Sequence, residues 1–275
     1  MRAAYGGRPP AVTHQHEHAA TVAVTTTVAA VIAVLLAGGY LAAAARTPGW
    51  SRWRAAAFTG GVALAAFALI GPLAAYAAAD FRGHMTQHLL VAMLAPLGLV
   101  LGAPVTLLLR ALPRPYARRL GGLLRARVPH LLAHPVTALV LSTGGMIVLY
   151  CTPLYRAAMV TPWLHELVHV HFLLSGCLFA WAIAGPDPAP RRPSVPARLV
   201  VLGVAVAAHA GLSQLMYAGL WVDLPVPAAQ RTGAAEIMYY GGDLAELLLA
   251  AVLVAGWRPV RRPAPAAHAR HQPIG

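Results

Sequence analysis

Residues 84–110 read HMTQHLLVAMLAPLGLVLGAPVTLLLR, and this stretch decides the class of fold. It holds no charged residue before Arg110. It is also longer than the roughly 20 apolar residues that cross a bilayer as a helix. Because lipid offers no hydrogen-bond partner to the backbone, such a segment must satisfy its own peptide groups and is predicted to be helical. Pro96 and Pro104 are expected to kink it.

The composition extends this conclusion to the whole chain of 275 residues. Hydrophobic residues make up 59% and charged residues 11%, whereas about 25% of a typical globular protein is charged. So few charges cannot cover a water-soluble fold of this size, which excludes a soluble enzyme, a disulfide scaffold and a disordered chain. Cys151 and Cys177 stand alone, without a C-x-x-C motif, which argues against a thiol metal or redox site. The sequence predicts an all-α, polytopic membrane helix bundle.

Seven transmembrane helices are predicted within a domain of residues 19–257. The spans are about 19–45, 55–79, 84–109, 135–151, 163–185, 198–221 and 232–257. Residues 1–18 form a tail that contains His14, His16 and His18, and residues 258–275 form a basic tail. A cleaved signal peptide is the alternative for the first span, since Ala42–Ala45 resembles a small-residue cleavage site.

The arginines predict the orientation of the bundle. All 21 basic residues are Arg; sixteen lie in the odd-numbered loops and the C-terminal tail, and five lie in the N-terminal tail and the even-numbered loops. Because cytoplasmic loops are enriched in positive charge, the N-terminus is expected outside and the C-terminus in the cytoplasm. The net charge of +13 therefore reflects topology beside anionic lipid, and without a basic patch interleaved with aromatics no nucleic-acid partner is expected.

Two histidine pairs begin two of the predicted spans on the outer side. His84 and His88 are four residues apart, and so are His165 and His169. This spacing places each pair on one helical face. Since neutral imidazole is the commonest metal ligand in proteins, the two pairs are predicted to converge on one metal. The alternative is that these imidazoles simply lie at the headgroup boundary.

Further polar residues lie deeper in the last two predicted spans. His209 is near the middle of the sixth span, and Met216 follows on its face as a soft ligand toward the outer pairs. One stripe of the seventh span carries Glu236, Tyr239, Asp243 and Glu246. Asp243 matches His209 in depth, and since an intramembrane carboxylate needs a partner, a hydrogen bond between the two is predicted. The alternative is a polar pair that only ties two helices together.

The pentapeptide His165-Glu166-Leu167-Val168-His169 also reads H-E-x-x-H, the zinc-protease signature. In that interpretation Glu166 is the general base and Glu236 can be taken as a third ligand. The context disfavours it, since no protease-like soluble domain is predicted.

Four segments stand out together: residues 84–110, His134-Pro135, Pro153-Leu154-Tyr155 and the His165…His169 pair. They resemble the CtaG-type cytochrome c oxidase assembly factors of Gram-positive and related bacteria, and the likeness covers roughly residues 55–257. The resemblance implies a multi-pass protein of a bacterial plasma membrane that supplies copper to aa-type oxidases. It implies oxidase subunits or other copper-delivery proteins as partners, besides membrane lipid. The family's histidine in the sixth span and acidic residue in the last are matched by His209 and Asp243.

Three functions follow as hypotheses. The first is a non-enzymatic copper chaperone for oxidase assembly, without catalytic residues, that takes copper from the extracytoplasmic side. Its expected ligands are His84, His88, His165, His169 and His209, supported by Asp243, Glu236, Met216 and Glu166. Imidazole and thioether suit copper, although zinc, nickel and iron also accept imidazole. The second is a membrane zinc metalloprotease, and the third is an electron carrier with haem held between histidines of two helices.

Overall fold

The computed structural model describes residues 10–188 and 192–257, and within these the side chains of residues 10–25 and of residue 130 are left undescribed. The predicted basic tail 258–275 lies outside the described residues. Every regular element in the described part of the chain is helical, which confirms the all-α class.

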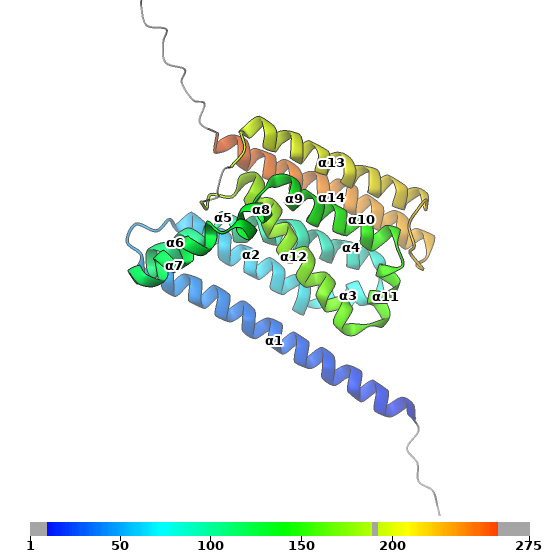
Figure 1. The fold of residues 1–275 in the computed structure, drawn as a ribbon. Coiled ribbons are helices and arrows are strands. Elements are labelled where there is room, and N and C mark those ends of the chain that lie inside the picture. The colour runs from blue at the N-terminus through cyan, green and yellow to red at the C-terminus, as the bar shows by residue number, and fades with distance from the viewer. Residues whose placement is uncertain (1–9, 189–191, 258–275) are drawn as a thin grey trace, which may run out of the picture.

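The described chain forms long helices joined by short ones (Figure 1). In chain order these are α1 (Pro10–Arg46), α2 (Arg52–Ile70), α3 (Pro72–Ala79), α4 (Phe81–Leu89), η1 (Leu90–Leu94), α5 (Ala95–Leu101), α6 (Pro104–Ala111), α7 (Arg114–Leu124), α8 (Arg127–Leu132), α9 (Pro135–Leu139), η2 (Val140–Gly144), α10 (Gly145–Cys151), α11 (Leu154–Val160), α12 (Pro162–Ala184), α13 (Val195–Ala218) and α14 (Ala228–Ala255). The segments η1 and η2 are π-helical and continue the helices on either side of them.

Within the described residues, six helical stretches are long and apolar enough to cross a membrane. They are Thr26–Arg46, Arg52–Ile70, Phe81–Ala111, Pro162–Ala184, Val195–Ala218 and Ala228–Ala255. The stretch Pro135–Cys151 joins them only when it is counted with Leu154–Val160, from which it bends by 79°. The chain is therefore a polytopic membrane protein, and the predicted fourth span, 135–151, is the first half of this bent pair.

The first helix begins earlier than the sequence predicts. It starts at Pro10, so the backbone of His14, His16 and His18 is helical rather than part of a tail; their side chains lie outside the described residues. At its other end Tyr40 stacks on Phe58 of α2 with ring centroids 4.0 Å apart. The Tyr40 hydroxyl also donates to the carbonyl of Gly102 over 2.6 Å. These contacts hold α1 to α2 and α6 along one edge of the bundle (Figure 1).

The two prolines of the third span have different effects. Pro96 lies one residue after Ala95, which directly follows η1, and the chain stays helical through it. A π-helical turn is a known way to absorb a break in the regular hydrogen-bond ladder. At Pro104 the helix instead ends and restarts, because Ala103 takes a left-handed conformation with φ 51°. The predicted kink is thus a short interruption between Leu101 and Pro104, within a stretch that still forms one candidate span.

Asp187, between α12 and α13, caps the restarted helix α6. Its carboxylate accepts from the amides of Val105 over 3.1 Å and Thr106 over 2.7 Å. Nearby, Arg192 donates to the carbonyl of Gly185 over 2.6 Å at the end of α12. A carboxylate at a helix start and a guanidinium at a helix end satisfy backbone groups that the helices leave unpaired. The arginine-rich end of the bundle is thereby fixed.

The remaining spans pack around α4 and α12. The helices α13 and α14 lie side by side, α4 packs between α14 and α3, and α12 crosses η1 and α5 (Figure 1). Gly176 of α12 lets this crossing close, since a Cβ there would clash with the carbonyl oxygen of Ala92. The starts of α4 and α12 therefore lie at the same end of the bundle, away from the arginine-rich loops (Figure 1).

Candidate metal-binding site

Three of the predicted ligands line one small cavity between α4 and α12, which we call the outer cavity. His84 and His88 come from α4 and His169 from α12, and the volume is about 10 Å³. The other lining residues are apolar: Val91, Leu149, Val168 and Phe172. A space of this size holds a single water-sized particle, and so one ion. The i,i+4 spacing and the crossing of the two helices place the imidazoles together.

His84 lies deepest in an aromatic setting and is 6% exposed. Its ring stacks on Phe81 with centroids 5.6 Å apart and meets the edge of Tyr155 at 5.2 Å. Its Nε2 lies 3.4 Å from the hydroxyl of Tyr150, which is fully buried. The aromatic rings fix the plane of the imidazole, so that it needs little rearrangement to bind an ion.

The start of α4, which carries His84, is set by Asp80. The Asp80 carboxylate accepts from the amide of Arg82 over 2.8 Å, as an N-cap does. The Arg82 guanidinium lies 2.6 Å from the same carboxylate and lowers the pKa of Asp80. The cap therefore stays ionised and holds the first turn of α4 in place.

Gln87 orients His169, a role that no motif in the sequence indicates. The Gln87 amide donates to the carbonyl of Ala68 over 2.9 Å. That carbonyl needs an outside donor because its usual helical partner would be the nitrogen of Pro72, which has no hydrogen. The Gln87 oxygen then faces His169 Nε2 at 3.2 Å and accepts a hydrogen bond from the Nε2–H group. His169 Nδ1 is left as a buried lone pair with no hydrogen-bond partner, free to bind a metal.

His165 and Glu166 stand next to the outer cavity. The rings of His165 and His169 are 4.4 Å apart, and one ligand atom from each of His165, Glu166 and His169 lies within 4.8 Å of the others. Glu166 is exposed, whereas both imidazoles are half-buried. The structure thus places His165 against His169, one step outside the cavity that His84, His88 and His169 line.

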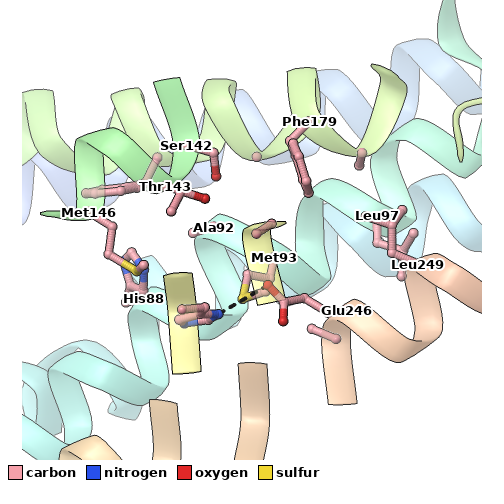
Figure 2. A pocket seen from close by; sticks show the side chains of 16 residues that line it. His88, Ala92, Met93, Leu97, Ser142, Thr143, Met146, Phe179, Glu246 and Leu249 are labelled. Carbon is pink, nitrogen blue, oxygen red and sulfur yellow. Dashed lines mark hydrogen bonds and ion pairs between the residues drawn. The ribbon is translucent and has the colours of Figure 1, made fainter. Parts of the chain in front are cut away.

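A second cavity, which we call the inner cavity, continues from His88 into the bundle and measures about 50 Å³ (Figure 2). His88 lines both cavities. Across from it are His209 of α13 and Glu246 of α14, 7% and 5% exposed, with His209 Nδ1 3.4 Å from Glu246 Oε1. The thioethers of Met93 and Met146 also line this space.

The predicted partner of His209 is wrong: the carboxylate beside it belongs to Glu246. Asp243 is only half-buried and makes no hydrogen bond to His209. The imidazole of His209 packs directly against Gly242 of α14, where a Cβ would clash with His209 Cε1. The imidazole occupies the space that this glycine leaves. The buried face of α14 therefore runs through Gly242 and Glu246 rather than through Asp243.

Two other supporting residues also lie elsewhere. Met216 is fully buried, but it packs with Met85, Tyr150 and Met238 in the main apolar core and does not line either cavity. Glu236 is exposed on α14 and lines neither cavity. The thioethers at the inner cavity are those of Met93, on η1, and Met146, on α10. No spacing in the sequence singles these two out from the other methionines.

Comparisons with known proteins show the family to which the chain belongs. A family model described as cytochrome c oxidase caa3 assembly factor (Caa3_CtaG) matches residues 17–259. Uncharacterized proteins of Mycobacterium bovis and Mycobacterium tuberculosis are each 40% identical to the chain over 178 residues, which is 62% of the chain and 27% of the relative. An uncharacterized protein of Mycobacterium leprae is 34% identical over 230 residues, 76% of the chain and 34% of the relative. The chain thus spans about a third or less of the length of these relatives. No solved structure matches.

Proposed function

The chain belongs to the cytochrome c oxidase caa3 assembly factor family, and from this premise we propose that it binds copper and passes it to an oxidase during assembly. The bound copper is cargo, held by the imidazoles of α4 and α12. The role is one of binding and transfer, and no residue of the chain is assigned a catalytic step. The partners are then subunits of cytochrome c oxidase or other copper-delivery proteins, in a bacterial plasma membrane.

The outer cavity is the observation that supports the proposal most directly. Three imidazoles from two helices line a space that fits one ion. One of them, His169, has its proton held by Gln87 and offers a lone pair that nothing else uses. A buried, unsatisfied nitrogen is costly unless a ligand completes it. Imidazole nitrogens suit copper in either oxidation state.

The surrounding loops favour loading from the extracytoplasmic side. The outer cavity lies at the end of the bundle with few arginines, which the charge rule assigns to the outside. There the loop between α13 and α14 is tied to the end of α10, since the amide of Asp223 donates to the carbonyl of Tyr150 over 3.0 Å. An ion pair between Asp223 and Arg156 holds that loop down. His165 and Glu166, at the rim, are the side chains that an incoming ion meets first.

The two alternative functions can be separated from this one. The haem hypothesis conflicts with size, since cavities of about 10 and 50 Å³ are far too small for a macrocycle. The protease hypothesis has the cluster of His165, Glu166 and His169 in its favour. In a protease Glu166→Gln removes the general base and abolishes hydrolysis. In a copper site built on imidazoles, the same change leaves most of the affinity in place.

The proposal is tested by metal binding and by oxidase maturation. We expect His88→Ala to weaken binding of Cu(I), measured anaerobically against a chromogenic chelator, by at least about tenfold. The same variant, expressed in cells that lack the wild-type chain, should yield oxidase with less copper. His134→Ala is the matched control, because His134 is exposed and only caps α9. Wild-type affinity and full oxidase copper in His88→Ala would contradict the proposal.

A further inference from the structure

We infer that the inner cavity is a second site, which takes a soft monovalent cation such as Cu(I) from the outer cavity through His88. This rests on the proposed function and adds to it an inner position with its own ligands. Those ligands are the imidazoles of His88 and His209 and the thioethers of Met93 and Met146, with Glu246 beside them (Figure 2). Nothing in the sequence assigns the methionines or Glu246 to a site.

Two buried polar atoms point to a ligand in this cavity. His209 Nε2 and Glu246 Oε2 are both buried, and neither has a hydrogen-bond partner. The second ring nitrogen of His209 faces Glu246 Oε1, so a proton shared there leaves Nε2 as a free lone pair. A carboxylate that orients a metal-binding imidazole in this way is common around metals. Such polar atoms buried within a membrane are functional candidates by default.

The thioethers make the site selective for a soft ion. Met93 and Met146 reach the cavity from different parts of the chain, and Figure 2 shows the sulfur of Met146 toward His88 and that of Met93 toward Glu246. A thioether is a soft, uncharged sulfur ligand of the kind that selects Cu(I). The other wall includes Ser142 and Thr143 of η2, and Met93 itself lies on η1. Both π-helical segments thus line one cavity, and π-bulges recur at functional sites.

Charge favours a monovalent ion over a divalent one. Glu246 is the one acidic residue among those lining the inner cavity, and no arginine lines it. A single carboxylate neutralises a single positive charge, so the occupied site is neutral. A divalent ion would leave a net charge inside the membrane, where an uncompensated charge is costly. The site therefore discriminates by ligand softness and by charge together.

His88 connects the two sites. It lines the outer cavity with His84 and His169 and the inner cavity with His209. Its ring packs against Phe172, 4.6 Å between centroids, and Phe172 also lines both cavities. An ion held by His84, His88 and His169 can exchange ligands one at a time for His209 and a thioether while His88 stays bound. Transfer then needs no passage of a bare ion through apolar surroundings.

The test is the copper stoichiometry of the full chain, purified in detergent and titrated anaerobically with Cu(I) against a chromogenic chelator. We expect the wild-type chain to bind two Cu(I). The double variant Met93→Leu/Met146→Leu keeps the side-chain volume and should lose the inner ion. The matched control is Met216→Leu/Met238→Leu, two buried methionines outside both cavities, which should still bind two. Zn(II) titration of the first double variant should match wild type.

The outcomes separate this inference from the proposed function. His165→Ala/His169→Ala should lose the outer ion and keep the inner one, and Glu246→Gln should weaken the inner one by roughly 10- to 100-fold. Equal copper binding by the Met93/Met146 and Met216/Met238 double variants overturns the inner site, whether both keep two ions or both lose one. If the His165→Ala/His169→Ala variant still binds two Cu(I) ions, the outer site is overturned instead.

Discussion

Replacing Gln87 by Leu should weaken copper binding without adding or removing a single ligand. Gln87 holds two groups at once, the carbonyl of Ala68 over 2.9 Å and the Nε2–H of His169 over 3.2 Å. Leucine has a similar volume, makes neither hydrogen bond and offers no atom to a metal. His169 is then free to rotate and to place its proton on either nitrogen. The imidazole of His169, whose Nδ1 is buried without a partner in the wild-type chain, then loses its fixed orientation.

The expected size of the effect can be taken from comparable partners of metal-binding histidines. Loss of such a partner lowers metal affinity by roughly 10- to 100-fold. This corresponds to about 1.4 to 2.8 kcal/mol of binding free energy. The free energy of unfolding should also fall, by about 1 to 3 kcal/mol, because Ala68 is fully buried and Pro72 cannot replace the lost donor to its carbonyl.

The assay is competition for Cu(I) between the purified chain and a chromogenic chelator, with the inner site removed by His209→Ala so that the outer site alone is measured. Thr86→Val is the control, since Thr86 lies on the same turn and its hydroxyl bonds only to the carbonyl of Arg82. We expect the control to bind as its parent does. A Gln87→Leu chain that binds copper as tightly as the control would refute the role given to this side chain.

Three further outcomes are expected. Gly242→Ala should push the ring of His209 away and lower occupancy of the inner site. Gly203→Ala is the control and should leave the copper stoichiometry unchanged, because a Cβ there meets nothing within 4 Å. If both variants keep the inner ion, the placement of His209 is contradicted. Asp187→Ala should lower the free energy of unfolding by about 1 to 2 kcal/mol through loss of the α6 cap, which chemical unfolding in mixed micelles measures; an unchanged midpoint would contradict it. Topology reporters fused within α7 and after Asp223 should report opposite sides of the membrane, and like signals would contradict the orientation.

The sequence predicts the fold class and most span positions because these depend on local composition. The stretch of residues 84–110 and the other apolar runs can only be helices in lipid, wherever their neighbours lie. The convergence of His84, His88 and His169 also had a local signal, since i,i+4 spacing fixes one face of each helix. The bend of 79° after Cys151 had no such signal, and it makes the fourth predicted span half of a broken pair.

The inner cavity could not be predicted because it depends on helix rotation. Glu236, Asp243 and Glu246 occupy one polar stripe in an ideal helix, and only packing against α13 decides which of them faces His209. Gly242 decides it here, by leaving room for the ring. The π-helical segment η1 adds a residue to one turn, which rotates the later residues of the helix by about 100° relative to a regular α-helix. The side of the helix on which Met93 lies therefore cannot be predicted from α-helical periodicity.

Copper X-ray absorption tests the central claim most directly, namely that imidazoles from α4 and α12 hold one ion together. The measurement uses the His209→Ala chain loaded with one equivalent of Cu(I), so that the outer site alone is occupied. We expect a nitrogen shell at about 2 Å with imidazole scattering, reduced by His88→Ala on α4 and equally by His169→Ala on α12. If only one of these two substitutions reduces the nitrogen shell, or if neither does, a site shared between the two helices is contradicted.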